Sequence, residues 1–156
     1  MTGYKKVFID TAPLVYFLDD SAQYADKVES ILTEIMEQGS LMETSVITCE
    51  EYLVYPYRTD NREKVRAFYD FTSDCGVSLR PITKGMAEKA ARIRAQYPSF
   101  KAMDALQLAS AVELGCDIFL TNDKQLRQFS ELRCVTVDEW KLATQPDKEP
   151  ETAKTE

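Results

Sequence analysis

The sequence predicts an α/β fold, a three-layer sandwich with a central, mostly parallel sheet covered by helices on both faces. Short apolar runs that lack polar alternation, such as 7–9 and 118–121, are typical of strands buried on both faces. Segments of helical periodicity separate these runs along the chain, which is the pattern of parallel strands joined by crossover helices. With 156 residues, 44% of them hydrophobic and 29% charged, the chain fits one globular domain of ordinary size.

Five segments are expected as strands and seven as helices. The strands are expected at 7–9, 41–47, 77–82, 118–121 and 134–137. The helices are expected at 13–18, 25–36, 48–58, 61–73, 84–96, 104–114 and, as a short one, 124–129.

Particular residues mark where these elements begin and end. Pro13 suits a first helical turn, because its missing N–H would have no partner there. Ser21 is a candidate N-cap for the second helix, and Gly39 and Gly115 are expected to end helices. Pro81 cannot donate a ladder hydrogen bond, so the third strand is expected at an edge of the sheet.

Composition excludes several kinds of chemistry. The net charge of −7 argues against a module held to nucleic acid by bulk positive charge, though not against an enzyme with a local basic rim. The chain has no histidine, which excludes Ser-His-Asp and Cys-His catalysis and histidine-bound zinc. Catalysis would need carboxylates, hydroxyls, thiols, lysine or a bound metal. The four cysteines have no C-x-x-C spacing and are expected as free, buried thiols: Cys49, Cys75, Cys116 and Cys134.

Residues 1–143 are expected to form the domain, and 144–156 a disordered acidic tail, because the tail has two prolines and no large apolar residue. No apolar run approaches the ~18 residues of a membrane span, and no secretory signal is visible. A cytoplasmic protein is expected.

Four acidic residues stand where a parallel sheet gathers its ligands. Asp10 and Asp123 follow strands, whose carboxyl ends flank the ligand crevice of such a sheet, and Glu51 and Asp104 open helices. Each acid also has a purely structural interpretation. Either strand-end Asp can cap a helix, Thr48 with Glu51 matches a capping box, and an acid in a first turn suits the helix dipole.

Asp104 is the acid whose helical position argues most for a partner. Helical spacing aligns it with apolar Leu108 and Ala111, whereas Gln107 and Ser110 are expected on a wetter face. A charged acid facing the core costs several kcal/mol unless it is paired. A metal ion is a reasonable partner, because no histidine and few lysines are near it in sequence.

Four segments in this order resemble the sequence blocks of PIN-domain ribonucleases: VFIDTAPL at 7–14, SVITCEE at 45–51, MDALQLASA at 103–111 and FLTND at 119–123. The resemblance covers about residues 4 to 140 and is closest to the VapC-type toxins of bacterial toxin–antitoxin systems. Each block alone is weak, but the four in order and spacing form a strong joint signal.

The resemblance implies a metal-dependent endoribonuclease with a four-carboxylate site. It implies that Asp10, Glu51, Asp104 and Asp123 cluster at one end of the sheet and hold Mg²⁺ or Mn²⁺. The physical chemistry agrees, because carboxylate oxygens and water suit a hard divalent ion, and a dication relieves repulsion among four like charges. The ion could activate a bound water for attack on the phosphodiester.

Neighbouring residues extend this expected site. Thr11, Thr121 and Asn122 are expected to hydrogen-bond the carboxylates or the scissile phosphate, although all three also suit turns and caps. Two positions depart from the family pattern. Ala12 stands where many members have Asn or Ser, and the residues directly after Asp123 lack a further acid.

The expected partners are an RNA substrate, a cognate antitoxin and a second copy of the chain. Segment 52–57 has three tyrosines among apolar residues, more than one helix face can bury, which indicates a homodimer interface or an antitoxin groove. Two basic groups could contact phosphates or simply be solvated helix faces: Arg58, Arg62, Lys64 and Arg66, and Arg92, Arg94 and Lys101.

Other classes fit less well. A haloacid-dehalogenase-like phosphatase needs a second Asp where Ala12 stands, and the dispersed glycines form no phosphate-binding loop. A PIN-like scaffold that binds RNA or protein without cutting remains the alternative.

Overall fold

The structure is a computed structural model that describes residues 3–141, so the expected tail at 144–156 lies outside the described residues. A five-stranded sheet forms the centre in the order β3-β2-β1-β4-β5, and all four neighbouring pairs are parallel. The strands are β1 Lys6–Ile9, β2 Leu41–Ser45, β3 Val77–Arg80, β4 Ile118–Thr121 and β5 Arg133–Thr136. The predicted parallel sheet is therefore confirmed.

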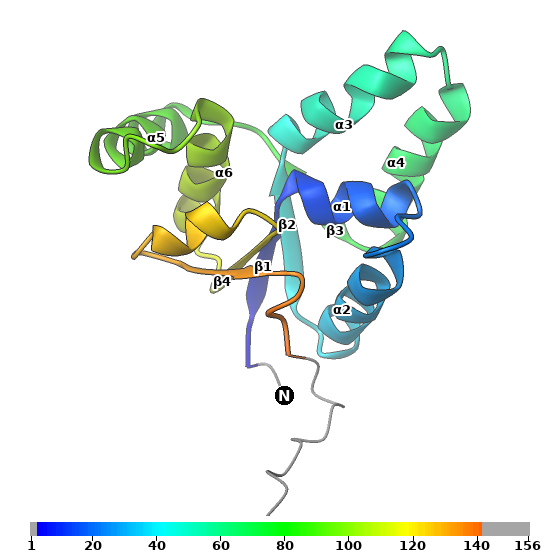
Figure 1. Cartoon of the computed structure of the whole chain (residues 1–156), viewed down its shortest axis with the longest axis horizontal. Helices are drawn as coiled ribbons and strands as arrows, with labels where there is room; N and C mark the ends of the chain where they lie inside the picture. The colour runs from blue at the N-terminus through cyan, green and yellow to red at the C-terminus, as the bar shows by residue number, and fades with distance from the viewer. Residues whose placement is uncertain (1–2, 142–156) are drawn as a thin grey trace, which may run out of the picture.

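Helices cover both faces of this sheet (Figure 1). They are α1 Thr11–Leu18, α2 Ala25–Glu37, α3 Val46–Arg58, α4 Arg62–Asp74, α5 Lys84–Gln96 and α6 Ala102–Glu113, with a short 3₁₀ helix, η1, at Lys124–Gln128. Helices α1 and α2 pack on one face, whereas α6 and η1 pack on the other, with α5 packed against the outer side of α6. This is the expected three-layer arrangement.

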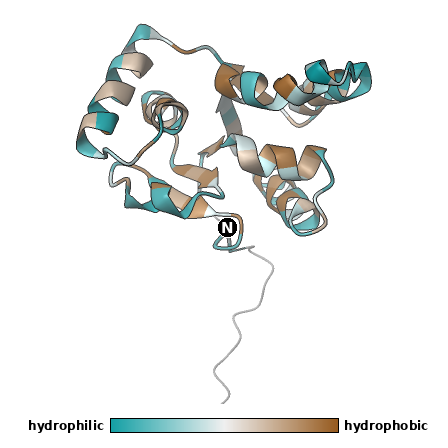
Figure 2. Ribbon diagram, turned by 45° about the horizontal axis from the view of Figure 1, so that its top comes forward, coloured by the Kyte–Doolittle hydropathy of each residue, from teal (hydrophilic) through white to brown (hydrophobic). Residues whose placement is uncertain are grey.

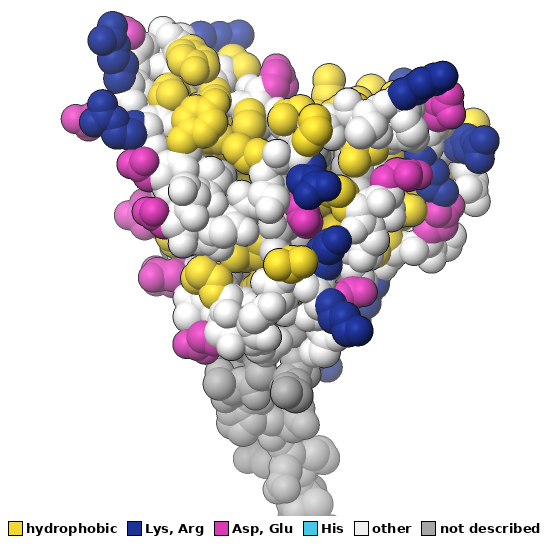
Figure 3. Space-filling model, turned by 180° about the vertical axis from the view of Figure 1, so that it is seen from behind, with side chains coloured by type: hydrophobic (Ala, Val, Ile, Leu, Met, Phe, Trp, Pro, Cys, Tyr) yellow, Lys and Arg dark blue, Asp and Glu magenta, His cyan; other side chains and the backbone are white. Residues whose placement is uncertain are grey.

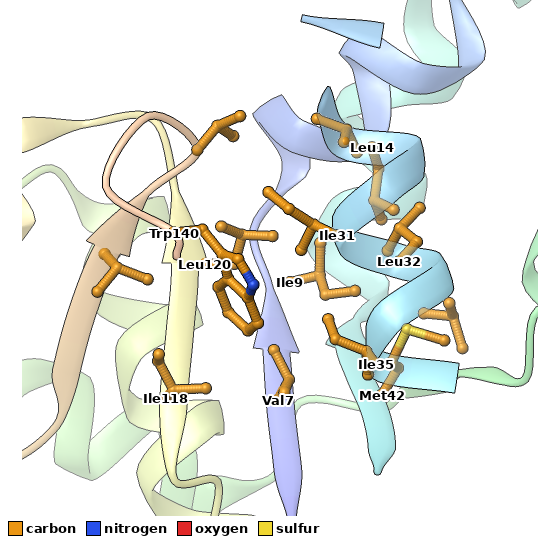
Figure 4. Packing of buried hydrophobic residues seen from close by; sticks show 14 of the residues in the cluster. Val7, Ile9, Leu14, Ile31, Leu32, Ile35, Met42, Ile118, Leu120 and Trp140 are labelled. Atoms are coloured by element: carbon orange, nitrogen blue, oxygen red, sulfur yellow. The ribbon is translucent and has the colours of Figure 1, made fainter. Parts of the chain in front are cut away.

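Alternation along each central strand divides the core into two clusters. Val7 and Ile9 point toward α1 and α2, and Phe8 between them points toward α6, because successive side chains of a strand face opposite ways. Figure 4 shows the first cluster, in which the indole of Trp140 lies over the sheet beside Leu120. Hydrophobic residues accordingly concentrate at the centre of the molecule, and hydrophilic residues on the outer helices (Figure 2).

Helices α3 and α4 form a hairpin that extends to one side of the sheet (Figure 1). A small separate cluster joins them, in which the rings of Tyr52 and Phe68 stack with centroids 5.2 Å apart. Asn61 caps α4, since its side-chain oxygen accepts a hydrogen bond from the Lys64 N–H at 3.1 Å. The hairpin is thus ordered by its own core and cap.

Most of the expected element boundaries are confirmed. Gly39 and Gly115 follow helices with a φ of 71°, the left-handed conformation that favours glycine. Pro81 lies directly after β3, which is an edge strand as predicted.

Four expectations about helix starts are wrong. Helices α1 and α6 begin at Thr11 and Ala102, each two residues before the expected start. Ser21 does not cap α2 through its side chain, because α2 begins only at Ala25, whose N–H bonds the Ser21 carbonyl instead at 2.9 Å. The second strand ends at Ser45, and α3 begins at the next residue, Val46, two residues before the expected start. Strand and helix are continuous here because Ser45 ends the one and caps the other.

The expectation that the cysteines are free and buried is confirmed in part. All four cysteines are free; Cys116 and Cys134 are buried, but Cys49 and Cys75 are only half-buried. Among residues 3–141, no helix is long and apolar enough to cross a membrane.

Candidate active site

The four acids singled out in the sequence line one open pocket of about 330 Å³. Asp10 connects β1 to α1, and Asp123 follows β4 by two residues. Glu51 lies in the second turn of α3, and Asp104 in the first turn of α6. Parallel strands end at the same edge of the sheet, which is why segments far apart in sequence meet here.

Asp10 is the most buried acid of this pocket and is held by two hydrogen bonds. Its Oδ1 accepts from the Thr11 N–H at 2.9 Å, and its Oδ2 accepts from the Thr121 hydroxyl at 2.8 Å. Burial raises the pKa of Asp10 to about 6, and the nearby charges of Asp104 and Glu51 add to the rise, against the two hydrogen bonds. The expected N-cap role is real, but it leaves one oxygen bound only to a strand-end threonine.

Asp104 shares this negative environment. Burial raises its pKa first, followed by the charges of Asp123 and Glu51, while Lys101 opposes the rise. The acids therefore destabilise one another's charged forms. A bound cation is the general remedy for such a group of carboxylates.

Glu51 is not part of a capping box. The N-cap of α3 is Ser45, whose hydroxyl accepts from the Ile47 N–H at 3.1 Å. Thr48 lies inside the helix, where it is completely buried. Glu51 instead accepts a hydrogen bond at its Oε1 from the Thr11 hydroxyl at 2.8 Å, which ties α3 to the start of α1.

Asp123 and Asn122 make local contacts beside the pocket. Asp123 caps η1 by accepting from the Gln125 N–H at 2.9 Å, so its N-cap interpretation also holds. Asn122 donates its side-chain amide to the hydroxyl of Tyr16 at 2.8 Å rather than to a carboxylate. Tyr16 lines the pocket and was missed in the sequence, where it falls in an ordinary apolar helix.

The expected polar face of α6 is wrong. Gln107 and Ser110 were expected on a wetter side, yet only 1% and 0% of their surfaces are exposed. Helix α6 lies between the sheet and α5, so two of its sides are buried and polar residues on both need internal partners. Asp104, expected to face the core, is instead partly exposed at the pocket.

The donor chemistry of the pocket fits a hard divalent cation. Four carboxylates and two threonine hydroxyls supply only oxygen atoms, which are the ligands preferred by Mg²⁺ and Mn²⁺. Across residues 3–141, no group of three or more His, Cys, Asp or Glu side chains lies close enough together to hold a metal ion. An ion that keeps several of its waters needs only one or two direct carboxylate ligands, as Mg²⁺ commonly does.

Fold and pocket together define an α/β protein with a carboxylate-lined pocket at the carboxyl edge of a parallel sheet. The family model of the PIN domain matches residues 7–132, and the chain belongs to the PIN domain family. The resemblance seen in the sequence blocks is thereby confirmed. Among curated protein sequences, none matches the chain.

Solved structures with a similar fold include toxin–antitoxin proteins. VapBC2 from Rickettsia felis, bound to a promoter DNA fragment, has a TM-score of 0.70 and 13% identity over 84% of this chain and 98% of the other. DNA-bound VapBC from Salmonella typhimurium has a TM-score of 0.63 and 20% identity over 85% and 98%. VapC20 from Mycobacterium tuberculosis, a Sarcin-Ricin loop cleaving toxin, has a TM-score of 0.59 and 18% identity over 81% and 98%.

Proposed function

We propose that this protein is a toxin-type PIN endoribonuclease that hydrolyses RNA phosphodiester bonds with the help of Mg²⁺ or Mn²⁺. The observation that carries the proposal is the convergence of four carboxylates, from four separate elements, on one pocket at the sheet edge. The similar fold of VapC20, a Sarcin-Ricin loop cleaving toxin, supports this reaction class.

In this mechanism the four acids have different roles. Asp10 and Asp104 would hold the ion, because these are the two carboxylates whose burial and neighbours most favour a cationic partner. Asp123 would be a further ligand or would orient the attacking water, and Glu51 would act through water or a second ion. The metal, when bound, lowers the pKa of a water and stabilises charge on the phosphate.

The hydroxyls of the pocket hold the carboxylates in place. Thr121 donates to Asp10, and Thr11 donates to Glu51, so each of these acids keeps one orientation before substrate arrives. Lys101, at the start of α6, lies close enough to influence Asp104 and is a candidate contact for an RNA phosphate. Of the other basic group, Lys64 pairs instead with Asp19 at 3.3 Å.

Cleavage of RNA by the purified protein, with Mg²⁺, with Mn²⁺ or with EDTA, tests this function. Metal is expected to be essential, and Asp104→Asn is expected to lower the rate by about a hundredfold or more, because it removes a charge that holds the ion. Asp70→Asn, the same chemical change at an exposed position of α4, serves as the control and should cleave normally. Equal cleavage by both variants would show a contaminating nuclease, and metal-stabilised protein that never cuts would favour a binding scaffold.

We also propose that the exposed side of segment 52–57 docks a second copy of the chain or an antitoxin. Tyr55 and Tyr57 are 64% and 65% exposed, while Tyr52 and Leu53 fill the hairpin core. Figure 3 shows hydrophobic side chains gathered on this side of the molecule, flanked by basic residues. Similar folds include a toxin–antitoxin complex from Klebsiella pneumoniae.

Light scattering on a Tyr55→Ser/Tyr57→Ser variant tests the homodimer. The wild type is expected at twice the mass of one chain and the variant at the mass of one chain, because both exposed rings are lost from the interface. Met36→Ser, which removes an exposed apolar side chain from α2, should leave the mass unchanged. The same mass for wild type and double variant would show that these two rings do not form a homodimer interface.

A further inference from the structure

A buried polar network lies directly behind the acidic pocket. Thr44 and Ser45 end β2, Thr48 belongs to the first turn of α3, and Gln107 comes from α6. All four residues are buried, with at most 1% of the surface of each exposed. Burying so many polar groups is costly unless each has a partner, and every one of them does.

The network reaches Glu51 through Thr11. Gln107 Nε2 donates to the Thr48 hydroxyl at 3.0 Å, and its Oε1 accepts from the Ser45 hydroxyl. The Thr48 hydroxyl lies 3.1 Å from that of Thr11, which donates to Glu51 at 2.8 Å. An unbroken path of hydrogen bonds therefore joins α6 to an acid of the pocket.

The direction of each hydroxyl proton in this path is fixed by simple counting. A hydroxyl has one proton to donate and two lone pairs to accept with. Thr11 uses its proton on Glu51, so in the contact between Thr11 and Thr48 the donor must be Thr48. Thr48 has then no proton left for Thr44, which must donate to it at 2.8 Å.

Gln107 fits this arrangement because it offers a donor and an acceptor side by side. Its amide nitrogen supplies the second bond that Thr48 can accept and also donates to the Thr11 hydroxyl at 3.5 Å, and its carbonyl takes the proton of Ser45. With the amide turned around, its oxygen would compete for the Thr48 proton, and Thr11 would lose its donor. Only one orientation satisfies every member of the network.

We propose that Gln107, acting through Thr48 and Thr11, is a positioning residue. It holds the Glu51 carboxylate in the pocket with its Oε1 oriented to accept the hydrogen bond from Thr11. The inference rests on the proposed function, since it concerns an acid of that same site. It assigns to α6 a second contribution beside Asp104, made by a residue one turn further along the helix. Gln107 itself does not line the pocket.

Mn²⁺ affinity measured by calorimetry on the metal-free full chain tests this role. Gln107→Leu, which keeps the volume but neither polar group, and Thr48→Val, which loses only the hydroxyl, are each expected to bind Mn²⁺ about tenfold more weakly. Thr48→Ser retains the hydroxyl and should restore wild-type affinity. Ser110→Ala is the matched control, because it removes a buried hydroxyl of α6 that, among residues 3–141, donates to the Leu106 carbonyl of its own helix.

A double-substitution cycle separates positioning from general structural support. In a Glu51→Gln background, Gln107→Leu is expected to weaken Mn²⁺ binding no further, because the residue acts through Glu51. The same tenfold loss in that background would overturn the proposal, as would wild-type affinity in both Gln107→Leu and Thr48→Val. If one variant does not fold, the other decides. A wild-type protein that binds no Mn²⁺ would instead overturn the proposed metal site itself, and this inference with it.

Discussion

Asp10→Asn is expected to abolish RNA cleavage and yet to stabilise the metal-free protein at neutral pH. The carboxylate is buried beside two other acids, so folding must bring an unfavourable charge into the pocket. Asparagine keeps the hydrogen bond from the Thr11 N–H, and its amide can donate to the Thr121 oxygen after that hydroxyl turns. The substitution thus removes the charge and retains the contacts.

The stabilisation should depend on pH in a defined window. The pKa of Asp10 is about 6 in the folded chain against an ordinary 3.8, so the folded state binds more protons between these values. Wild-type stability from this group therefore falls as pH rises from about 4 to about 6, and the full cost, on the order of 3 kcal/mol, is present above that window.

Urea unfolding in EDTA at pH 4 and pH 7.5, for wild type and Asp10→Asn, measures this effect. The variant should be more stable at pH 7.5 by up to about 3 kcal/mol, and the difference should shrink to under about 1 kcal/mol near pH 4. Mg²⁺ or Mn²⁺ should raise the stability of the wild type and not of the variant, since a ligand stabilises only the state that binds it. A variant that is less stable than wild type at both pH values would contradict the claim that the buried Asp10 charge destabilises the metal-free protein.

Phe119→Ala is expected to cost about 3–5 kcal/mol of unfolding free energy. Phe119 is fully buried on β4, and its ring stacks on that of Phe8 in the neighbouring strand, with centroids 5.2 Å apart and planes 5° from parallel. The loss would be a large share of a typical domain stability of about 5–15 kcal/mol. Removal of the ring leaves a cavity between the central strands and α6.

Urea unfolding again gives the measurement, with two comparisons that isolate the cavity. Phe119→Leu keeps most of the volume and should cost much less, about 1.5 kcal/mol or under. Met36→Ala removes an exposed apolar side chain of α2 and should stay within about 0.5 kcal/mol of wild type. A cost for Phe119→Ala below about 1 kcal/mol would mean that the stacked pair does not support the sheet.

The layer architecture was accessible from sequence because both of its signals are local. Unbroken apolar runs such as 118–120 are typical of strands buried on two faces, and glycines follow the ends of the helical stripes at the crossovers. Helix starts were harder to predict. Ser45 ends β2 and caps α3 at once, so the sequence offers no polar loop that would separate strand from helix.

The acids of the pocket were identifiable for a different reason: each follows a strand or lies in the first two turns of a helix at the edge where parallel strands gather ligands. The residues behind them were not. Gln107 and Thr48 look in sequence like a surface amide and a helix cap. Gln107 is buried because α6 packs between the sheet and α5, and Thr48 lies inside α3, where it contacts Gln107. Their role depends on contacts across 59 positions of the chain, which helical periodicity cannot reveal.

The abrupt junctions between strands and helices have a consequence for how this protein can change. One residue separates β1 from α1, and none separates β2 from α3. An insertion at either junction would displace an acid from the pocket, so these points cannot be lengthened without losing the site. The turn at 59–61, between α3 and α4, carries no such restriction and lies away from the sheet edge. New recognition sequences, whether acquired by evolution or grafted by design, should be accepted there.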